Sequence, residues 1–337
     1  MLTRWIPAAS LATTLLLPLA VLAAGTRTPV SNAGNDANTA FSCDATHPCR
    51  TFAAALTQTT PGGEILAIDS SGYGKVVIDR SVSIIAAPGI FAGIGVGAGG
   101  NATGVQIATA GVNVVLRGLA ITGQGGTYGI HMTGGARLSV ENCVVANFSS
   151  GAQLGMLVNT PAKVRVVNTT FRDNTGNSIF SGGATASVSD SKFLGGDVGL
   201  YVTDYYGGTS VVTTAFVDRS VASGGIYGFV AENHNSGNTS RLYVTDSVAS
   251  NAGIGIRASS SAGSAKVSVS SSGVFGNSNG LAAAGSGTTL VANGNTVTGN
   301  AFGLIQSAGA AFESAGDNLV RDNVTASSGT ISPVGKL

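Results

Sequence analysis

Residues 217–222 read VDRSVA, and residues 244–249, 27 positions later, read VTDSVA. Each stretch is a short run of β-branched and small residues around one polar bend residue. Related stretches recur along the chain: LRGLAI at Gly118, VENCVV at Asn142, VVNTTF at Asn168, VSDSKF at Asp190, VSSSGV at Ser271, NGNTVT at Asn295 and AGDNLV at Asn318. Successive bend residues are 24, 26, 22, 29, 27, 25, 24 and 23 positions apart. The chain is therefore an array of repeats of about 25 residues.

A second set of short runs follows the same period. Most of these runs begin with glycine: GIHM at Gly129, GMLV at Gly155, SIFS at Ser178, GLYV at Gly199, GFVA at Gly228, GIRA at Gly255, GLAA at Gly280 and GLIQ at Gly303. No helical periodicity lies between the two sets, and the runs alternate like strands between Gly, Ser and Asn. Short strands at a fixed period predict a solenoid in which each coil stacks on the next.

The bend residues predict how successive coils are joined. A recurrent Asn or Asp at a bend fits a ladder of side chains that bond backbone groups at the turn. A leucine-rich repeat has a similar period, but it needs regularly spaced leucines, whereas Val, Ser, Thr and Ala fill these runs. A left-handed hexapeptide helix needs a six-residue period, which is absent.

The coils and their turns, such as NTTFRDN and NTVTGN, resemble right-handed parallel β-helix proteins of the pectin-lyase-like superfamily. The opening SNAGNDANTAFSCDATHPCRTFAAAL is similar to the N-terminal part of exported bacterial β-helix proteins, many without an assigned activity. The resemblance implies an all-β fold, a single-stranded right-handed parallel β-helix. Residues 49–59, CRTFAAALTQT, would form a short amphipathic helix that closes the first coil, because an open solenoid end requires a cap.

The domain organisation follows from the two ends of the chain. Residues 1–24 combine one Arg with an apolar run that ends on small residues, which predicts a cleaved signal peptide. The alternative is an uncleaved membrane anchor, because the run is nearly long enough to span a bilayer. We expect a cap over 25–61, the β-helix over 62–325 and a C-terminal tail over 326–337. The protein would then be secreted, periplasmic or on the cell surface.

Three cysteines bear on the cap and the core. Cys43 and Cys49 lie close together in a loop that contains proline, and in an exported protein they predict a disulfide. A metal site built on these thiols and His47 is the alternative, although it would need further ligands. Cys143 has no partner in the sequence, and we expect a small buried apolar residue.

Charge and composition limit the classes of partner. The chain has 17 basic and 16 acidic residues, only 10% charged residues and no charge runs. A weakly charged, nearly neutral surface argues against nucleic acid or anionic lipid as the partner. The 43% hydrophobic content is ample for a core and argues against disorder. We expect a monomer without a membrane span in the mature chain.

The superfamily resemblance implies an enzyme, since it includes pectate lyases, polygalacturonases and alginate epimerases. Glycoside hydrolysis needs paired carboxylates, and a calcium-dependent lyase needs several around the ion. Here the nearest two acids in sequence, Glu313 and Asp317, are four positions apart. The Asn-Thr-Asp, paired-Asp and Asp-Pro-His-Asp motifs of those enzymes are absent. We therefore expect no metal site and no cofactor. Calcium is the alternative, for which the sequence offers no clustered carboxylates.

Candidate site residues come instead from two long turns on consecutive coils. The segments from Gly199 to Arg219 and from Gly228 to Asp246 span 20 and 18 residues, the longest of their series. They place Asp204 and Glu232 at nearly equivalent positions, because stacked strands lie about 4.8 Å apart. Three further residues would lie beside these acids: Tyr205, Tyr206 and His234. The candidate catalytic residues are Asp204, Glu232 and His234.

A column of side chains adds a possible contact surface. If the apolar residue after each glycine of the second set points inward, the next residue points outward. That column reads His131, Leu157, Phe180, Tyr201, Val230, Arg257, Ala282 and Ile305. An exposed apolar and aromatic stripe predicts a binding surface, with ligand contacts from Phe180, Tyr201, Tyr205, Tyr206 and Arg257. Two alternatives remain: the protein itself covers the stripe, or the phase is wrong by one residue.

Three functions are compatible with these features. The first is an exported β-helix that binds an extracellular or cell-surface polysaccharide without cleaving it. The second is a polysaccharide lyase or glycoside hydrolase that uses Asp204 and Glu232, assisted by His234 or Arg257. The third is a structural or adhesive surface protein whose hydrophobic stripe mediates self-association.

Overall fold

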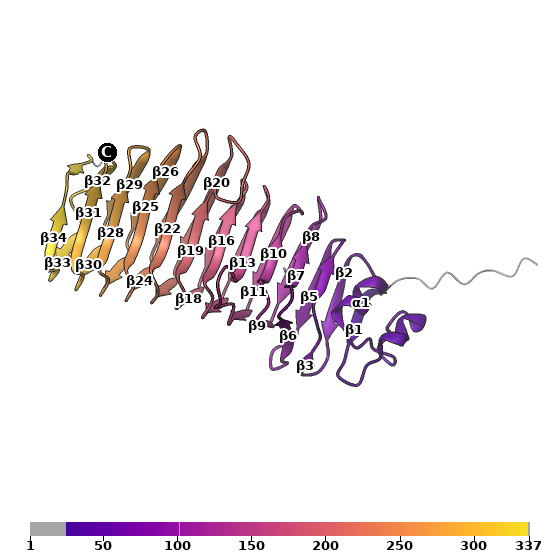
Figure 1. The fold of residues 1–337 in the computed structure, drawn as a ribbon. Coiled ribbons are helices and arrows are strands. Elements are labelled where there is room, and N and C mark those ends of the chain that lie inside the picture. The colour runs from indigo at the N-terminus through magenta and orange to yellow at the C-terminus, as the bar shows by residue number, and fades with distance from the viewer. Residues whose placement is uncertain (1–24, 101, 336–337) are drawn as a thin grey trace, which may run out of the picture.

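The computed structural model describes residues 25–335 except residue 101, and it shows a right-handed parallel β-solenoid. Consecutive coils stack along one axis, from helix α1 (Phe52–Gln58) to strand β34 (Thr325–Ser328) at the far end (Figure 1). Each complete coil gives one strand to each of three parallel sheets. The fold predicted from the repeat is confirmed. The proposed signal peptide, 1–24, lies outside the described residues.

The three sheets are named A, B and C in the order in which a coil contributes to them. Sheet A contains β1 (Gly25–Val30), β2 (Thr59–Ala67), β5 (Val82–Ala86), β8 (Asn113–Arg117), β11 (Arg137–Glu141), β14 (Lys163–Val167), β17 (Thr185–Ser189), β20 (Val212–Asp218), β23 (Thr239–Thr245), β26 (Ser264–Ser270), β29 (Thr288–Asn293), β32 (Ala311–Ser314) and β35 (Ile331–Pro333). Sheet B contains β3 (Ser71–Gly72), β6 (Ala92–Gly97), β9 (Leu119–Gln124), β12 (Val144–Ala146), β15 (Thr170–Arg172), β18 (Lys192–Leu194), β21 (Val221–Ser223), β24 (Val248–Ser250), β27 (Gly273–Phe275), β30 (Thr296–Thr298) and β33 (Leu319–Arg321). Sheet C contains β4 (Val76–Ile78), β7 (Thr103–Ile107), β10 (Tyr128–Met132), β13 (Leu154–Asn159), β16 (Gly176–Ser181), β19 (Val198–Thr203), β22 (Tyr227–Asn233), β25 (Ile254–Ser260), β28 (Asn279–Ala284), β31 (Phe302–Ser307) and β34.

The N-terminal end of the stack is closed by helix α1 and by the 3-10 helix η1 (Asp36–Phe41). Thr51 caps α1 by accepting a hydrogen bond from the backbone N–H of Ala54 at 3.1 Å. Phe52 is fully buried against the first coil, so the amphipathic helix expected over 49–59 is confirmed. A disulfide joins Cys43 to Cys49, as predicted.

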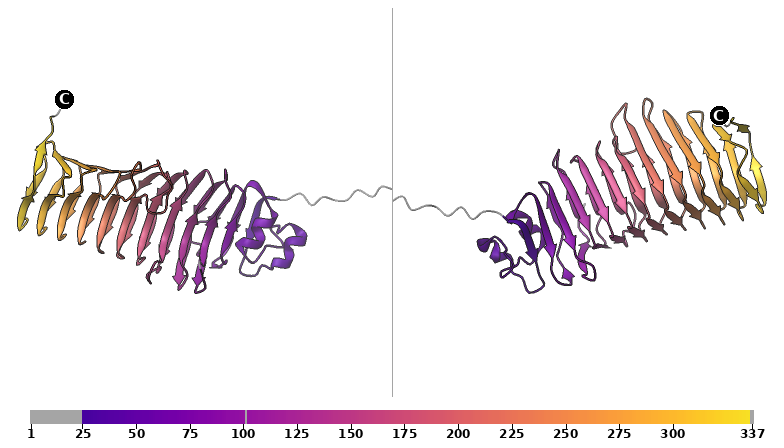
Figure 2. Two further views of the ribbon diagram at one scale, coloured as in Figure 1. Left: turned by 45° about the horizontal axis from the view of Figure 1, so that its top comes forward. Right: turned by 180° about the vertical axis from the view of Figure 1, so that it is seen from behind.

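The C-terminal end continues the sheets further than the sequence indicated. Residues 326–337 were expected as a tail, but β34 pairs with β31 and β35 pairs with β32. Seen from behind, the stack is elongated, and its C-terminal end lies far from α1 (Figure 2). Among the described residues, no helix is long and apolar enough to cross a membrane.

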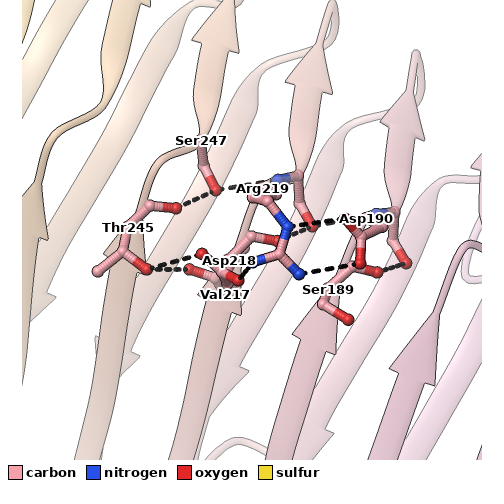
Figure 3. Close-up of polar contacts among 9 residues, drawn as sticks. Ser189, Asp190, Val217, Asp218, Arg219, Thr245 and Ser247 are labelled. Carbon is pink, nitrogen blue, oxygen red and sulfur yellow. Dashed lines mark hydrogen bonds and ion pairs between the residues drawn. The ribbon is translucent and has the colours of Figure 1, made fainter.

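The corner between sheets A and B explains the recurrent bend residue. Arg219, Asp246 and Ser271 adopt left-handed backbone conformations there, with φ of 43°, 47° and 49°. Asn and Asp tolerate this region better than most residues, which accounts for their frequency at the bend. Arg219 also reaches back to Asp190 on the preceding coil, with nitrogen–oxygen distances of 2.9 and 3.1 Å (Figure 3).

From Ser191 to Ser272 the ladder residue lies one position after the predicted bend residue, which corrects the predicted position there. At Asn295 and Asn318 the predicted residue is itself in the ladder. The backbone N–H of Ser191 donates to Ser220 Oγ at 3.1 Å, and that of Ser220 donates to Ser247 Oγ at 3.0 Å. The series continues toward the C-terminus to Asn295, which accepts from the N–H of Ser272 at 3.0 Å. The bend residue is exposed and changes the chain direction, whereas the following residue points inward and joins the coils.

The glycines of the second set allow successive coils to approach closely. A Cβ added at Gly228 would lie 2.4 Å from the carbonyl oxygen of Gly255, and one added at Gly199 would lie 2.6 Å from that of Gly228. One coil departs from this pattern, because Asn177 fills the equivalent place between Gly176 and Ser178. Its side chain is fully buried and donates to the carbonyl oxygen of Gly195 at 2.9 Å.

Ser178 offers a test of polar burial in the core. Its side chain stacks between Met156 and Leu200, and its buried hydroxyl has no hydrogen-bond partner among the described residues. An unpaired hydroxyl is costly, so Ser178→Ala is expected to raise the free energy of unfolding by about 1 kcal/mol. Chemical denaturation would measure the change.

The matched control for Ser178 is Ser191, which is equally buried at 1% exposure. Its hydroxyl accepts from the N–H of Thr169 and donates to the carbonyl oxygen of Ser189. Ser191→Ala should therefore destabilise the protein by about 1 to 2 kcal/mol. If Ser178→Ala and Ser191→Ala lowered the free energy of unfolding equally, the opposite effects expected from their hydrogen bonding would be disproved.

Candidate functional site

The predicted outward column lies on the outer face of sheet C, with one correction. Strand pairing aligns His131 with Leu157, Leu157 with Ile179, and Ile179 with Tyr201. The assignment of Phe180 to this column was wrong, because Phe180 pairs with Val202 and is fully buried in the core. The run SIFS had been aligned from Ser178, although Asn177 occupies the glycine position of that coil. A slip of one residue exchanges the two faces of a strand.

Much of the stripe is covered by the protein itself. Leu154, Leu157 and Ile179 form a separate buried cluster on the outside of sheet C, at 5%, 2% and 5% exposure. The aromatic rings of Tyr128, Tyr201 and Tyr206 pack against this cluster. The alternative of a covered stripe is therefore correct in these coils. Tyr206 comes from the first long turn, so one function of that turn is to shield apolar surface.

Asp204 ties the two long turns together. Its carboxylate accepts the backbone N–H groups of His234 and Asn235, both at 2.8 Å, and the side-chain amide of Asn238 at 3.1 Å. The residue is only 1% exposed. Three donors occupy the oxygens of this carboxylate and leave it little access to a ligand. Asp204 therefore orders the site and does not face it.

Glu232 lies at the centre of the remaining cluster. The hydroxyl of Tyr201 donates to its Oε2, and Arg257 Nη2 lies 3.4 Å from its Oε1. His234 Nε2 is 3.6 Å from Glu232 Oε2 and 3.4 Å from the Tyr201 hydroxyl oxygen. The structure thus brings together four of the predicted site residues, which come from three consecutive coils.

Val230 is the apolar neighbour of Glu232 on the same strand, β22, two residues earlier. Val230 pairs with Tyr201 on one side and with Arg257 on the other, and it is 2% exposed. The Arg257 guanidinium lies over the ring of Tyr227, 5.1 Å from its centroid. This cation–π contact and the Glu232 pair fix the guanidinium from two directions. Tyr227 was missed in the sequence, although it directly precedes a glycine of the second set.

Tyr205 is the exposed member of the site. Its side chain is 69% exposed, and its ring meets His234 edge to face at a centroid distance of 6.0 Å. The Tyr206 ring packs edge to face against the other side, at 5.1 Å. Tyr205 therefore presents a supported aromatic surface to solvent beside the Glu232 cluster.

The phenol of Tyr201 is a permanent hydrogen-bond donor to Glu232. Burial, followed by the hydrogen bond to Glu232, raises the pKa of the Tyr201 phenol far above its ordinary value. The phenol therefore stays protonated and holds the carboxylate in one orientation. Within residues 25–335, residue 101 excepted, no group of three His, Cys, Asp or Glu side chains is arranged to hold a metal ion.

The other sequence candidates occupy structural positions. His47 stacks on Phe41 in the cap, with ring centroids 4.6 Å apart, and its cysteine neighbours are joined as a disulfide. Cys143 is free and buried, as expected. Burial raises the pKa of the Cys143 thiol to about 11, which leaves it protonated and unreactive at neutral pH.

Among solved structures, similar folds belong to pectate lyase Pel9A and to two phage tailspikes. The pectate lyase is 14% identical, with a TM-score of 0.48, over 92% of this chain and 78% of that one. Tailspike protein 3 of bacteriophage CBA120 is 11% identical, with a TM-score of 0.41, over 91% of this chain and 60% of that one. Tailspike protein 2 from Escherichia coli O157:H7 bacteriophage CAB120 is 11% identical, with a TM-score of 0.35, over 83% of this chain and 38% of that one.

A search of curated proteins finds no match. The family model described as right handed beta helix region matches residues 67–216 and 103–325, which together cover more than half of the chain. Those residues contain most of the stacked coils, the ladder from Ser191 to Asn295 and the whole Glu232 cluster. The chain therefore belongs to the right-handed β-helix family.

Proposed function

We propose that this protein is exported and binds a polysaccharide at the outer face of sheet C without cleaving it. The observation that carries the proposal is the exposed ring of Tyr205 beside a carboxylate that is fixed by neighbouring side chains. Sugar rings present apolar faces that stack on aromatic rings, and their hydroxyls pair with charged groups. The disulfide of the cap supports an oxidising location outside the cytoplasm.

The charges of the cluster favour binding over hydrolysis. Hydrolysis needs a second carboxylate that faces the glycosidic bond, and the buried Asp204 does not supply it. Glu232 and Arg257 are partly exposed, with side-chain exposures of 19% and 21%. Held in fixed positions, they can accept from and donate to sugar hydroxyls at little entropic cost.

The test is the substitution Tyr205→Ala, measured by affinity electrophoresis against a panel of neutral and acidic polysaccharides. Loss of a stacking ring is expected to weaken binding about tenfold while the thermal midpoint stays unchanged. The matched control is Phe91→Ala, which removes a ring that is 57% exposed outside the site. Equal effects of the two substitutions, or binding to none of the polysaccharides, would refute the proposal.

A second candidate function is a polysaccharide lyase in which Glu232 is the base. The observation that favours it is the position of Arg257, which could neutralise a substrate carboxylate while Glu232 takes the neighbouring proton. Elimination would leave an unsaturated sugar that absorbs ultraviolet light. Such absorbance with the unmodified protein, abolished by Glu232→Gln, would replace the binding proposal by this one.

A further inference from the structure

The outer face of sheet A carries a concentration of positive charge that the net charge of the chain conceals. From β8 to β29, strand register places eight charged side chains on this face, of which six are cationic and two are carboxylates. The cations are Arg117, Arg137, Lys163, Arg165, Arg241 and Lys266, and the carboxylates are Glu141 and Asp218. The face therefore has a local charge of +4, against +1 for the whole chain.

Most of these cations form a straight row along the solenoid axis. Arg137 pairs with Lys163 on the next strand, and three strands beyond Lys163, Arg241 pairs with Lys266. None of these four makes an ion pair within the described part of the chain. At about 4.8 Å per coil, the two pairs are about 14 Å apart. Thr185 and Thr214 occupy the positions between the pairs.

Two further features lie beside this row. A depression of about 520 Å³ on β8, β11 and β14 is lined by Arg137, Lys163 and Arg165 among other residues. Further along, Phe216 and Tyr243 stack with ring centroids 4.9 Å apart and an interplanar angle of 10°. Both rings are exposed, at 47% and 39%. Their column neighbours are Ser187 and Ser268, so small side chains leave room beside the ring pair.

We propose that the outer face of sheet A binds a linear acidic polysaccharide that runs along the solenoid axis. Its carboxylates or sulfates would pair with the cationic row, and its sugar rings would contact Phe216 and Tyr243. Serine and threonine hydroxyls in the same columns supply hydrogen bonds to sugar hydroxyls. This site is on a different sheet from the Glu232 cluster and takes a charged ligand, so it is independent of the first proposal.

The shape of the face favours this ligand over other polyanions. Duplex DNA is read by an element that enters a groove, whereas this face is a parallel sheet of many strands. An anionic membrane is bound by a cationic surface with many protruding apolar side chains, and here the exposed rings are stacked on one another. A flexible sugar chain can follow a straight row in which two pairs of cations lie about 14 Å apart.

The test uses carboxymethyl-cellulose as the acidic probe and hydroxyethyl-cellulose as its uncharged counterpart. The full chain should bind the first, with an affinity that falls as salt rises, and should bind the second far more weakly. The double variant Arg241→Gln/Lys266→Gln is expected to lose about tenfold in affinity, because two charge-assisted contacts are removed. Phe216→Ser should weaken binding without changing its salt dependence.

The matched control is Lys192→Gln/Arg321→Gln, which removes two exposed cations from sheet B and changes the net charge equally. Its affinity should stay within about twofold of the unmodified protein. Equal loss in the two double variants, or equally tight binding of polyglutamate or of phosphatidylserine vesicles, would overturn the proposal. Tyr205→Ala should leave this binding unchanged, so failure at one sheet is distinguishable from failure at the other.

Discussion

Replacing Asn300 with Ala is expected to lower the free energy of unfolding by about 3 to 5 kcal/mol, because several buried hydrogen bonds are lost together. The Asn300 side chain is 1% exposed. Its Oδ1 accepts from the backbone N–H of Asn277 at 2.9 Å, and its Nδ2 donates to the carbonyl oxygen of Val274 at 3.1 Å. It also joins the amide of Asn323 on the following coil.

Chemical denaturation, with hydrogen exchange of the Asn277 amide, would measure this loss. Asn293→Ala is the matched control, because Asn293 lies nearby on sheet A and its partly exposed side chain makes no hydrogen bond in the described structure. Its substitution should change stability by less than about 0.5 kcal/mol. Asn277, Asn300 and Asn323 form a second ladder of side chains on successive coils. If Asn300→Ala lowered the free energy of unfolding no more than this control, this second ladder would not be what joins these coils.

Removing the Asp204 carboxylate is expected to disorder the second long turn and to weaken polysaccharide binding at sheet C. Asp204→Ala leaves the N–H groups of His234 and Asn235 without their acceptor, at a cost of about 2 to 4 kcal/mol. His234 would then leave its position beside Glu232. Binding should fall by at least about tenfold, even though Asp204 itself does not face the ligand.

Hydrogen exchange at residues 234 and 235, measured with polysaccharide affinity, tests this prediction. Asp204→Asn should have an intermediate effect, since its oxygen can still accept one of the N–H groups. Asp197→Ala is the control. Asp197 lies directly before β19 and Asp204 directly after it, and the exposed Asp197 side chain makes no ion pair or hydrogen bond in the described residues. If the backbone amides of His234 and Asn235 exchanged as slowly in Asp204→Ala as in the unmodified protein, the role assigned to the Asp204 carboxylate would be contradicted.

The fold was predictable because the same local demand recurs in every coil. A left-handed bend, an inward small polar residue and a glycine at a close backbone approach repeat about every 25 residues, as at Asp246, Ser247 and Gly255. Their repetition is visible without knowing any contact. The ladder position was missed by one residue at Ser191, Ser220, Ser247 and Ser272, because bend and ladder residues are adjacent and both are polar; Asn295 and Asn318 were placed correctly.

The candidate site was only partly predictable. The unequal turn lengths pointed to Glu232 and His234, and the outward column pointed to Tyr201 and Arg257. The structure brings these four together, because stacking aligns consecutive coils. Phe180 was misplaced because Asn177 replaces a glycine and removes the mark that sets the phase of that strand. The cationic face of sheet A was overlooked, because its cations, Lys163 and Arg165 excepted, lie 20 or more residues apart in the chain and average out in the net charge.

The amino-acid sequence alone establishes the parallel solenoid, the capping helix, the disulfide and the pair of coils that carries the longest turns. These depend on local conformational preferences and on a period, which a linear chain displays directly. Three-dimensional packing determines which polar groups are buried and which face solvent. Asp204 and Glu232 are one position out of register, because Glu232 pairs with Thr203. Asp204 accepts three hydrogen bonds inside a turn, whereas Glu232 is partly exposed beside Tyr201 and His234. This offset and the donors on the neighbouring coil are fixed only after the coils have stacked.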